Sequence, residues 1–120
     1  MTAAKRILVT GSRDWQDPVT IIDALIDEFE SKAVLVHGGA SGADFMAAKV
    51  WTKAGMPAEP HPADWSKGRG AGYERNAEMV ALGADVCLAF IRDESKGATH
   101  TAELAQKAGI RTIIYRESSS

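Results

Sequence analysis

The 120-residue sequence lacks the features that mark secreted, membrane-spanning or disulfide-rich proteins. Cys87 is the sole cysteine, which excludes an internal disulfide and fits a reducing compartment. No apolar run approaches the roughly 20 residues of a membrane span, and the N-terminus lacks a signal-peptide core. We therefore expect a cytoplasmic protein that does not bind membranes.

The chain also lacks a strong charge imbalance. Its formal net charge is -2 and its pI is about 5.9, so no overall positive field recruits nucleic acid. His37 and His100 have no metal-ligand spacing, and we expect neither a metal nor a cofactor. A hydrophobic fraction of 45% is that of a globular protein, and the length fits one domain, expected over residues 1–117 with a frayed tail at 118–120.

Short apolar runs alternate with segments of helical spacing. The runs predict strands at 5–10, 33–36, 58–63, 84–91 and 111–115. Helices are expected from Asp17-Pro18, after Gly42, over 73–82 and around 99–108, the first starting with an Asp cap and a proline. This alternation predicts a doubly wound α/β domain whose five-stranded, mainly parallel sheet has the order 3-2-1-4-5.

The segment 37–44, His-Gly-Gly-Ala-Ser-Gly-Ala-Asp, joins the second strand to its helix. Glycines there let a phosphate approach backbone N–H groups at the positive end of a helix. The alternative is an ordinary tight turn in which Ser41 and Asp44 form a capping box. The charge of Asp44 would repel a phosphate at the helix end, which favours capping or a hydrogen bond to a ribose hydroxyl.

Other polar loops follow the first and fourth strands or precede the fourth, and ligands bind at this edge of such sheets. Arg13 is expected to clamp a phosphate, the alternative being a salt bridge to Asp14 or Asp17. The predicted ligand-contacting residues are Gly11, Ser12, Arg13, Gly38, Gly39, Ser41, Gly42, Asp44, Arg75, Asn76, Gly97 and Thr99.

A glycine-rich, cationic loop at 64–72 indicates mobility and a preference for anions. Aromatic rings in polar loops can stack on a base, or they can pack as a lid over the edge of the core. The residues expected to cover the ligand are Trp15, Trp65, Lys67, Arg69 and Tyr73.

The ordered set of motifs resembles one superfamily. The segment 38–44 looks like the first glycine motif of the SLOG superfamily, the Rossmann-like group that contains the LOG enzymes and the DNA-processing protein Smf/DprA. Residues 73–79, with Lys96-Gly97-Ala98-Thr99, are similar to the second half of its pattern. The opening Gly11-Ser12-Arg13-Asp14 and the layout most resemble the small YspA-like branch. The resemblance implies binding of nucleotides or nucleotide-derived ligands.

LOG enzymes cleave the N-glycosidic bond of nucleoside 5′-monophosphates, and Arg75 matches their active-site Arg. Their motif Pro-Gly-Gly-x-Gly-Thr-x-x-Glu is eroded here, since Asp93-Glu94-Ser95 replaces its start, Ala102 occupies the glutamate position and Glu103 lies one residue late. One residue turns a helical side chain by about 100°. The resemblance to LOG also implies a homodimer.

The preferred interpretation is a module that senses or sequesters a nucleotide or an ADP-ribose-like molecule. Phosphate is expected on the turns at 38–42 and 97–99, with Arg13 and Arg75 as counter-charges. One alternative is a nucleoside-monophosphate phosphoribohydrolase with Arg75 and Glu103 as catalytic residues. A second is a single-stranded DNA-binding module, for which this acidic chain offers little basic surface.

Overall fold

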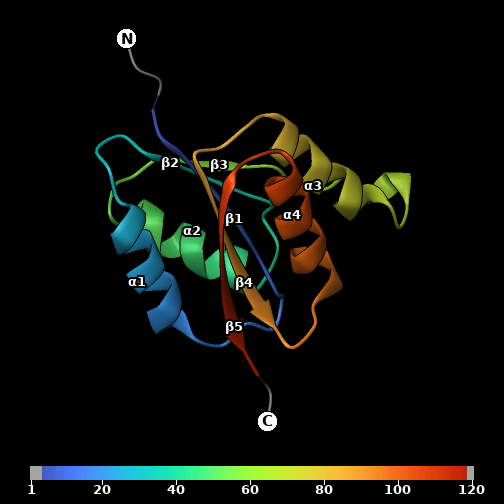
Figure 1. The fold of residues 1–120 in the computed structure, drawn as a ribbon, viewed down its shortest axis with the longest axis horizontal. Helices are drawn as coiled ribbons and strands as arrows, with labels where there is room; N and C mark the ends of the chain where they lie inside the picture. Colours follow the sequence, from blue (N-terminus) through green and yellow to red (C-terminus); the bar gives the residue numbers. More distant parts are fainter. Residues whose placement is uncertain (1–3, 119–120) are drawn as a thin grey trace.

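The computed structural model describes residues 4–118, in which strands and helices alternate along the chain (Figure 1). The tail expected at 118–120 lies outside the described residues, apart from Ser118. The elements in chain order are β1 (Arg6–Gly11), α1 (Pro18–Glu28), β2 (Val34–His37), α2 (Ala43–Lys53), β3 (Ala58–Pro60), the short 3-10 helix η1 (Trp65–Lys67), α3 (Ala71–Ala81), β4 (Val86–Arg92), α4 (Lys96–Lys107) and β5 (Arg111–Glu117).

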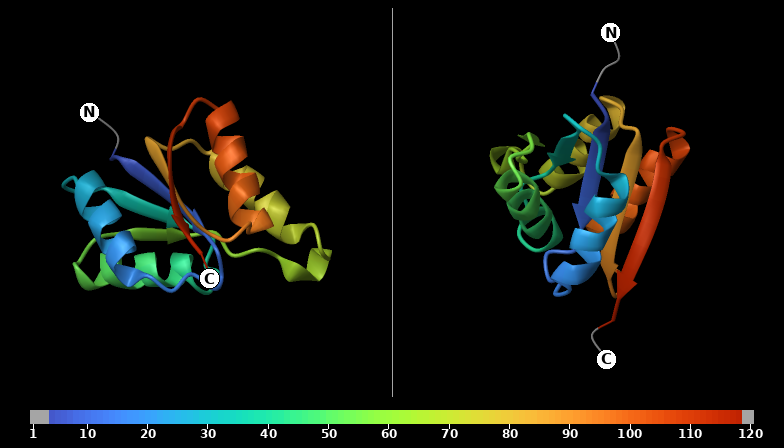
Figure 2. Two further views of the ribbon diagram at one scale, coloured as in Figure 1. Left: turned by 60° about the horizontal axis from the view of Figure 1, so that its bottom comes forward. Right: turned by 90° about the vertical axis from the view of Figure 1, so that its left-hand side faces the viewer.

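The strands form one parallel sheet with the order β3-β2-β1-β4-β5, which confirms the predicted doubly wound α/β fold. Alternate residues of β1 face opposite sides: Ile7 and Val9 pack toward α1 and α2, and Leu8 packs toward α3 and α4. Figure 2 shows the two helix pairs on opposite faces of the sheet. No helix within residues 4–118 is long and apolar enough to cross a membrane.

The neighbouring strands β1 and β4 send their connections to opposite faces of the sheet. After β1 the chain enters α1, and after β4 it enters α4 on the other side (Figure 1). The two connections therefore diverge and leave a gap at the carboxyl edge, as at the switch point of other doubly wound sheets.

Helix α3 begins at Ala71, two residues before the predicted start, and so takes up part of the expected loop at 64–72. Its buried face carries Asn76, Met79 and Val80, and Ala77 is exposed. The buried face of α3 thus includes one polar residue, Asn76.

Glycine is required where the loop after β1 contacts the start of α2. Gly42 has a φ of +77°, and a Cβ built on it would lie 2.3 Å from the carbonyl oxygen of Arg13 and 2.4 Å from that of Ser12. A Cβ on Gly11 would lie 2.3 Å from the Cβ of Ala43. The two segments thus touch through their backbones, which brings the ends of β1 and β2 together.

The replacement Gly42→Ala is expected to lower the free energy of unfolding by more than about 2 kcal/mol, because φ strain adds to a backbone clash. Gly83→Ala is the matched control, since Gly83 also has a positive φ, +84°, but a Cβ on it would meet nothing within 4 Å. It should cost only the strain, about 1 kcal/mol. Urea unfolding measures both losses. Equal losses would show that close packing at Gly42 contributes nothing.

Candidate functional site

A cavity of about 540 Å³ lies beyond the carboxyl ends of β1 and β4. Its wall combines the loops after these strands, the N-terminal parts of α3 and α4, and residues around η1. Small ligands of open α/β sheets bind at this place. The wall carries both signs of charge: Arg13, Arg69, Arg75 and Arg92, with Asp14, Asp44, Asp93 and Glu94.

The cavity brings together about half of the site residues predicted from the sequence. Those in its wall are Gly11, Arg13, Asp44, Trp65, Arg69, Tyr73, Arg75, Asn76 and Gly97. Those outside its wall are Ser12, Trp15, Gly38, Gly39, Ser41, Gly42, Lys67, Thr99 and Glu103.

Three amides of the glycine turn after β2, those of Gly38, Gly39 and Ala40, have internal acceptors. The N–H of Gly38 donates to Oδ2 of Asp44 at 2.9 Å, and the N–H of Ala40 donates to the same oxygen at 3.4 Å. The N–H of Gly39 donates to Nδ1 of His37 at 3.1 Å. A phosphate expected on the amides of Gly38 and Gly39 would have to displace these acceptors, because a satisfied amide has no hydrogen to offer a ligand.

Two buried side chains therefore hold the turn. Burial lowers the pKa of His37, and the neighbouring His61 lowers it further, so the ring stays neutral and its Nδ1 can accept a hydrogen bond. Asp44 is 4% exposed, and its side chain accepts hydrogen bonds from the glycine turn instead of capping α2. The N-cap of α2 is Gly42, with no side-chain hydrogen bond, so the capping box of Ser41 and Asp44 does not form.

The carboxyl group of Asp44 occupies an unfavourable environment for its charge. Burial raises the pKa of Asp44 to about 6, although the N–H groups of Gly38 and Ala40 and the charges of Arg75 and Arg13 favour the ionised form. Its Oδ1 has no hydrogen-bond partner among residues 4–118. Desolvation is thus the dominant effect on this carboxyl group.

Arg75 joins α3 to the glycine turn. Its Nη1 donates to the carbonyl oxygens of Gly38, at 2.5 Å, and His61, at 3.3 Å. Its Nε donates to Oδ1 of Asn76 at 2.8 Å, which fixes that buried side chain. A Cβ on Gly38 would lie 2.4 Å from Nη1, so glycine makes room there for the guanidinium group. Arg75 therefore both shapes the cavity and contributes a positive charge to its wall.

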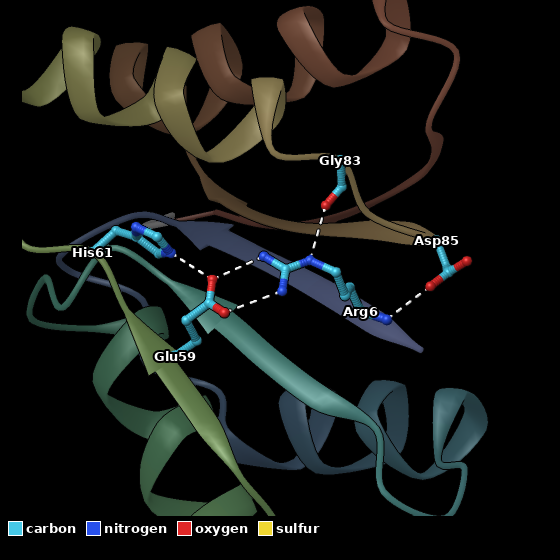
Figure 3. Close-up of polar contacts among 5 residues, drawn as sticks. All are labelled: Arg6, Glu59, His61, Gly83 and Asp85. Carbon is cyan, nitrogen blue, oxygen red and sulfur yellow. Dashed lines mark hydrogen bonds and ion pairs between the residues drawn. The ribbon is translucent and has the colours of Figure 1, made fainter. Parts of the chain in front are cut away.

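A second polar network supports this junction from β3 (Figure 3). The carboxylate of Glu59 accepts hydrogen bonds from Nη1 and Nη2 of Arg6 at 3.1 and 2.8 Å, and it lies 2.6 Å from Nε2 of His61. The bonds to Arg6 and then to His61 hold the pKa of Glu59 at about 2. Arg6 also donates to the carbonyl of Gly83 at the end of α3. The network thus steadies His61, whose carbonyl receives Arg75.

Ser12 and Trp15 are buried in the loop after β1 and lie outside the cavity wall, so the structure gives no support to their predicted contact with ligand. Oγ of Ser12, which is 1% exposed, accepts the N–H of Arg92 at 2.7 Å and so ties the loop to β4. Trp15 is 2% exposed and packs edge-to-face on Phe90 with ring centroids 5.5 Å apart. Its Nε1 donates to the carbonyl of Asp17 at 2.7 Å. The indole therefore belongs to the core.

Helix α4 turns Glu103 away from the cavity. Glu103 is exposed, while the preceding Ala102 packs in the core between α4 and the sheet. Oγ1 of Thr99 donates to the carbonyl of Ser95 at 2.6 Å, a bond within the first turn of the helix. The structure thus separates Glu103 and Thr99 from the cavity wall that contains Arg75.

The first turn of α4 does contribute to the cavity. Gly97 lies in the wall, and the N-cap residue Ser95 makes no side-chain hydrogen bond to the helix. Amides in the first turn of a helix have no acceptor within it, and the helix dipole makes this end positive. The first turn of α4 is therefore a candidate place for an anion, although the N–H of Thr99 donates to the carbonyl of Ser95 at 3.1 Å and Asp93 and Glu94 line the same cavity.

The two cationic side chains of the loop around η1, Lys67 and Arg69, lie on different surfaces of the protein. Arg69 lies in the cavity wall. Nζ of Lys67 lies 3.6 Å from Oε1 of Glu74, outside that wall, so the expected contact of Lys67 with ligand is not supported. Both residues are exposed, which makes them a matched pair for mutation.

Two exposed aromatic rings also line the cavity. Trp65 is 55% exposed, and Cζ of Arg13 lies 5.5 Å from the centroid of its ring. Tyr73 is 45% exposed and packs edge-to-face on His100, with centroids 4.7 Å apart. Both rings therefore have a free surface next to the cavity, unlike Trp15.

Arg92, Asp14 and Glu94 also line the cavity, although they were not among the predicted site residues. Arg92 pairs with Glu117 at 2.9 Å and with Asp14 at 3.7 Å. The sequence could have indicated them only by their position at the ends of strands: Arg92 ends β4, Asp14 follows β1 and Glu94 follows β4.

The described part of the chain contains no candidate metal site. No group of three or more His, Cys, Asp or Glu side chains within residues 4–118 is placed to hold a metal ion. Burial raises the pKa of the Cys87 thiol to about 12, which agrees with its interpretation as a core residue.

The raised pKa of Asp44 makes stability depend on pH. Between the pKa of 3.8 in the unfolded chain and about 6 in the folded protein, the folded state binds more protons, so stability falls as the pH rises through this window. The shift of about two units corresponds to about 3 kcal/mol. Asp44→Asn removes this titration. The wild type should therefore lose about 3 kcal/mol relative to the variant between about pH 4 and pH 7 in urea unfolding, and a constant difference would contradict the prediction.

Comparisons with known proteins agree with the motifs and with the fold. The family described as "YspA, cpYpsA-related SLOG family" matches residues 5–68, the segment from β1 through η1. The chain is also similar to the Gene 61 protein of Mycobacterium phage D29, with 48% identity over 120 aligned positions that cover 92% of this chain and 96% of that protein. Together with the sheet order, these matches establish that the chain belongs to the YspA, cpYpsA-related SLOG family.

Proposed function

We propose that this protein binds a nucleotide or a nucleotide-derived ligand, such as an ADP-ribose-like molecule, in the cavity beyond β1 and β4. The observation that carries the proposal is the meeting of an uncapped helix start, several arginines and exposed aromatic rings in one cavity. A volume of about 540 Å³ lies within the usual range for small-molecule sites. Membership of a SLOG family supports a nucleotide-related ligand.

The phosphate end of the ligand is proposed to lie against the first turn of α4. Gly97 presents backbone there without a side chain, and a Cβ on it would meet nothing within 4 Å. Arg69 and Arg75, in the same cavity, are the proposed counter-charges. Asp44 remains the proposed acceptor for a sugar hydroxyl, since its Oδ1 lacks a partner among residues 4–118. A ligand that carries both phosphate and hydroxyl groups suits such a mixed set of charges.

Sensing or sequestering the ligand has more support than hydrolysing it. The phosphoribohydrolase alternative assigned its catalytic carboxylate to Glu103, which lies on the exposed side of α4, outside the cavity wall. Binding of single-stranded DNA has less support, because the arginines of the cavity are matched by an equal number of carboxylates and the net charge is -2. The homodimer expected from the family resemblance stays a prediction, for which light scattering is the test.

Calorimetry with AMP, GMP, CMP, UMP, ADP and ADP-ribose is the direct test, and at least one of them is expected to bind. The replacement Arg69→Gln should then weaken binding by about tenfold, the usual effect of losing one charge-assisted hydrogen bond. Lys67→Gln removes the same charge from the same loop outside the cavity, and it should leave the Kd within about twofold of the wild type.

Two results would count against the proposal. One is the absence of binding by every compound of this panel at millimolar concentration. The other is equal weakening by the two variants, which would indicate a general charge effect. Chromatography of the recovered nucleotide separates binding from hydrolysis, because release of free base would revive the phosphoribohydrolase alternative.

A further inference from the structure

Arg13 and Trp65 meet over the cavity although they come from loops that follow different strands. Arg13 lies in the loop after β1, and Trp65 begins η1, which follows β3. Cζ of Arg13 is 5.5 Å from the centroid of the Trp65 ring, within the range of a cation–π contact. Both side chains are exposed and both line the cavity. Their contact is therefore formed at the surface, where a ligand can reach it.

Hydrogen bonds within η1 and a close approach to α3 position the Trp65 ring. Asp64 caps η1, with its Oδ1 accepting the N–H of Ser66 at 3.2 Å, and the N–H of Gly68 donates back to the carbonyl of Trp65 at 3.1 Å. A Cβ on Gly72 would lie 3.2 Å from Cη2 of the indole, so the edge of the ring packs on the bare backbone of α3. The ring thus has a fixed position although 55% of Trp65 is exposed.

Neither Asp14 nor Asp17, the two carboxylates expected to pair with Arg13, is free to do so. Asp14, one predicted partner, pairs with Arg92 at 3.7 Å. Asp17, the other, caps α1 by accepting the N–H groups of Val19 and Thr20. The planar guanidinium group of Arg13 is instead placed over an aromatic ring, the arrangement that Arg uses for stacking.

We infer that Arg13 and Trp65 form the subsite for the planar ring of the ligand: the nucleobase stacks on the indole, and the exposed guanidinium group of Arg13 moves outward to lie on the other face of the base. This inference rests on the proposed function and deepens it, because it makes the base, and not only the phosphate, a determinant of binding. Arg13 then stacks on the base, and the phosphate is left to Arg69, Arg75 and the start of α4. Stacking tolerates every base because each has a π-face, so selectivity among bases should be modest.

Tryptophan fluorescence can report whether a ligand contacts Trp65 in this subsite. Trp15 and Trp51 are 2% and 3% exposed, so Trp65 is the tryptophan that a bound base can touch. The nucleotide with the lowest Kd in the panel above should change the emission of the wild-type protein and leave that of Trp65→Phe unchanged. Trp65→Leu should weaken binding by about 5- to 150-fold, the usual range for losing one base–aromatic stack. Phe45→Leu removes an exposed ring outside the cavity wall and should leave the Kd unchanged.

Two replacements of Arg13 distinguish stacking from charge. Arg13→Lys keeps the charge but loses the planar group, and Arg13→Met loses both while keeping a side chain of similar reach. If Arg13 stacks on the base, both variants weaken nucleotide binding by a similar factor, and neither weakens competition by ribose 5-phosphate. If Arg13 instead neutralises the phosphate, Arg13→Lys keeps most of the affinity and Arg13→Met weakens both compounds. The second pattern would overturn the inference.

The failure of this inference can be told apart from that of the proposed function. Binding of the nucleotide that is weakened by Arg69→Gln but not by Trp65→Leu would overturn the inference and keep the proposed function. No binding by any nucleotide of the panel would overturn both. All these variants change exposed side chains, so unchanged melting temperatures should accompany the binding measurements.

Discussion

The site depends on one buried carboxyl group, that of Asp44. It accepts the amides of Gly38 and Ala40 and thereby bends the chain after β2 sharply enough for α2 to begin beside the end of β1. Arg75 then closes on the same turn from the other side of the sheet, through the carbonyl oxygen of Gly38. A side chain at Gly38 would occupy the space of the guanidinium group. One wall of the cavity is thus built from an acid and a base that both bind backbone groups.

This use of Asp44 and Arg75 determines where an anion can lie. The amides of the glycine turn are already satisfied, and the nearby carboxyl group, when ionised, repels negative charge. The first turn of α4 has no side-chain cap from Ser95, and Gly97 lies in the wall, although Asp93 and Glu94 line the same cavity. The proposed anion end of the cavity, at the start of α4, therefore differs from the turn that Asp44 holds, and a ligand with a phosphate at one end and hydroxyl groups elsewhere would suit this arrangement.

The fold could be predicted well from the sequence because it depends on pattern. Apolar runs such as Ile7-Leu8-Val9 require burial on both faces, and the alternation with helices leaves few sheet orders to choose from. The site could be predicted only in part, because the choice between a role in binding and a role in packing depends on tertiary contacts. Trp15 and Trp65 illustrate this point: both lie in polar loops, but Trp15 finds Phe90 to pack against, whereas Trp65 finds only the edge of α3 and Arg13.

The cavity consequently has a rigid inner part and an exposed outer part. Asp44, Asn76 and Arg75 are held by hydrogen bonds within the protein, so their positions do not depend on a ligand. Arg13 and Arg69 are exposed and approach from loops, where a change of side chain costs the fold little. Because stability resides in the inner part, the outer part can vary to suit different ligands. We expect relatives with this fold to keep the inner contacts and to differ mainly in the exposed residues that face the ligand.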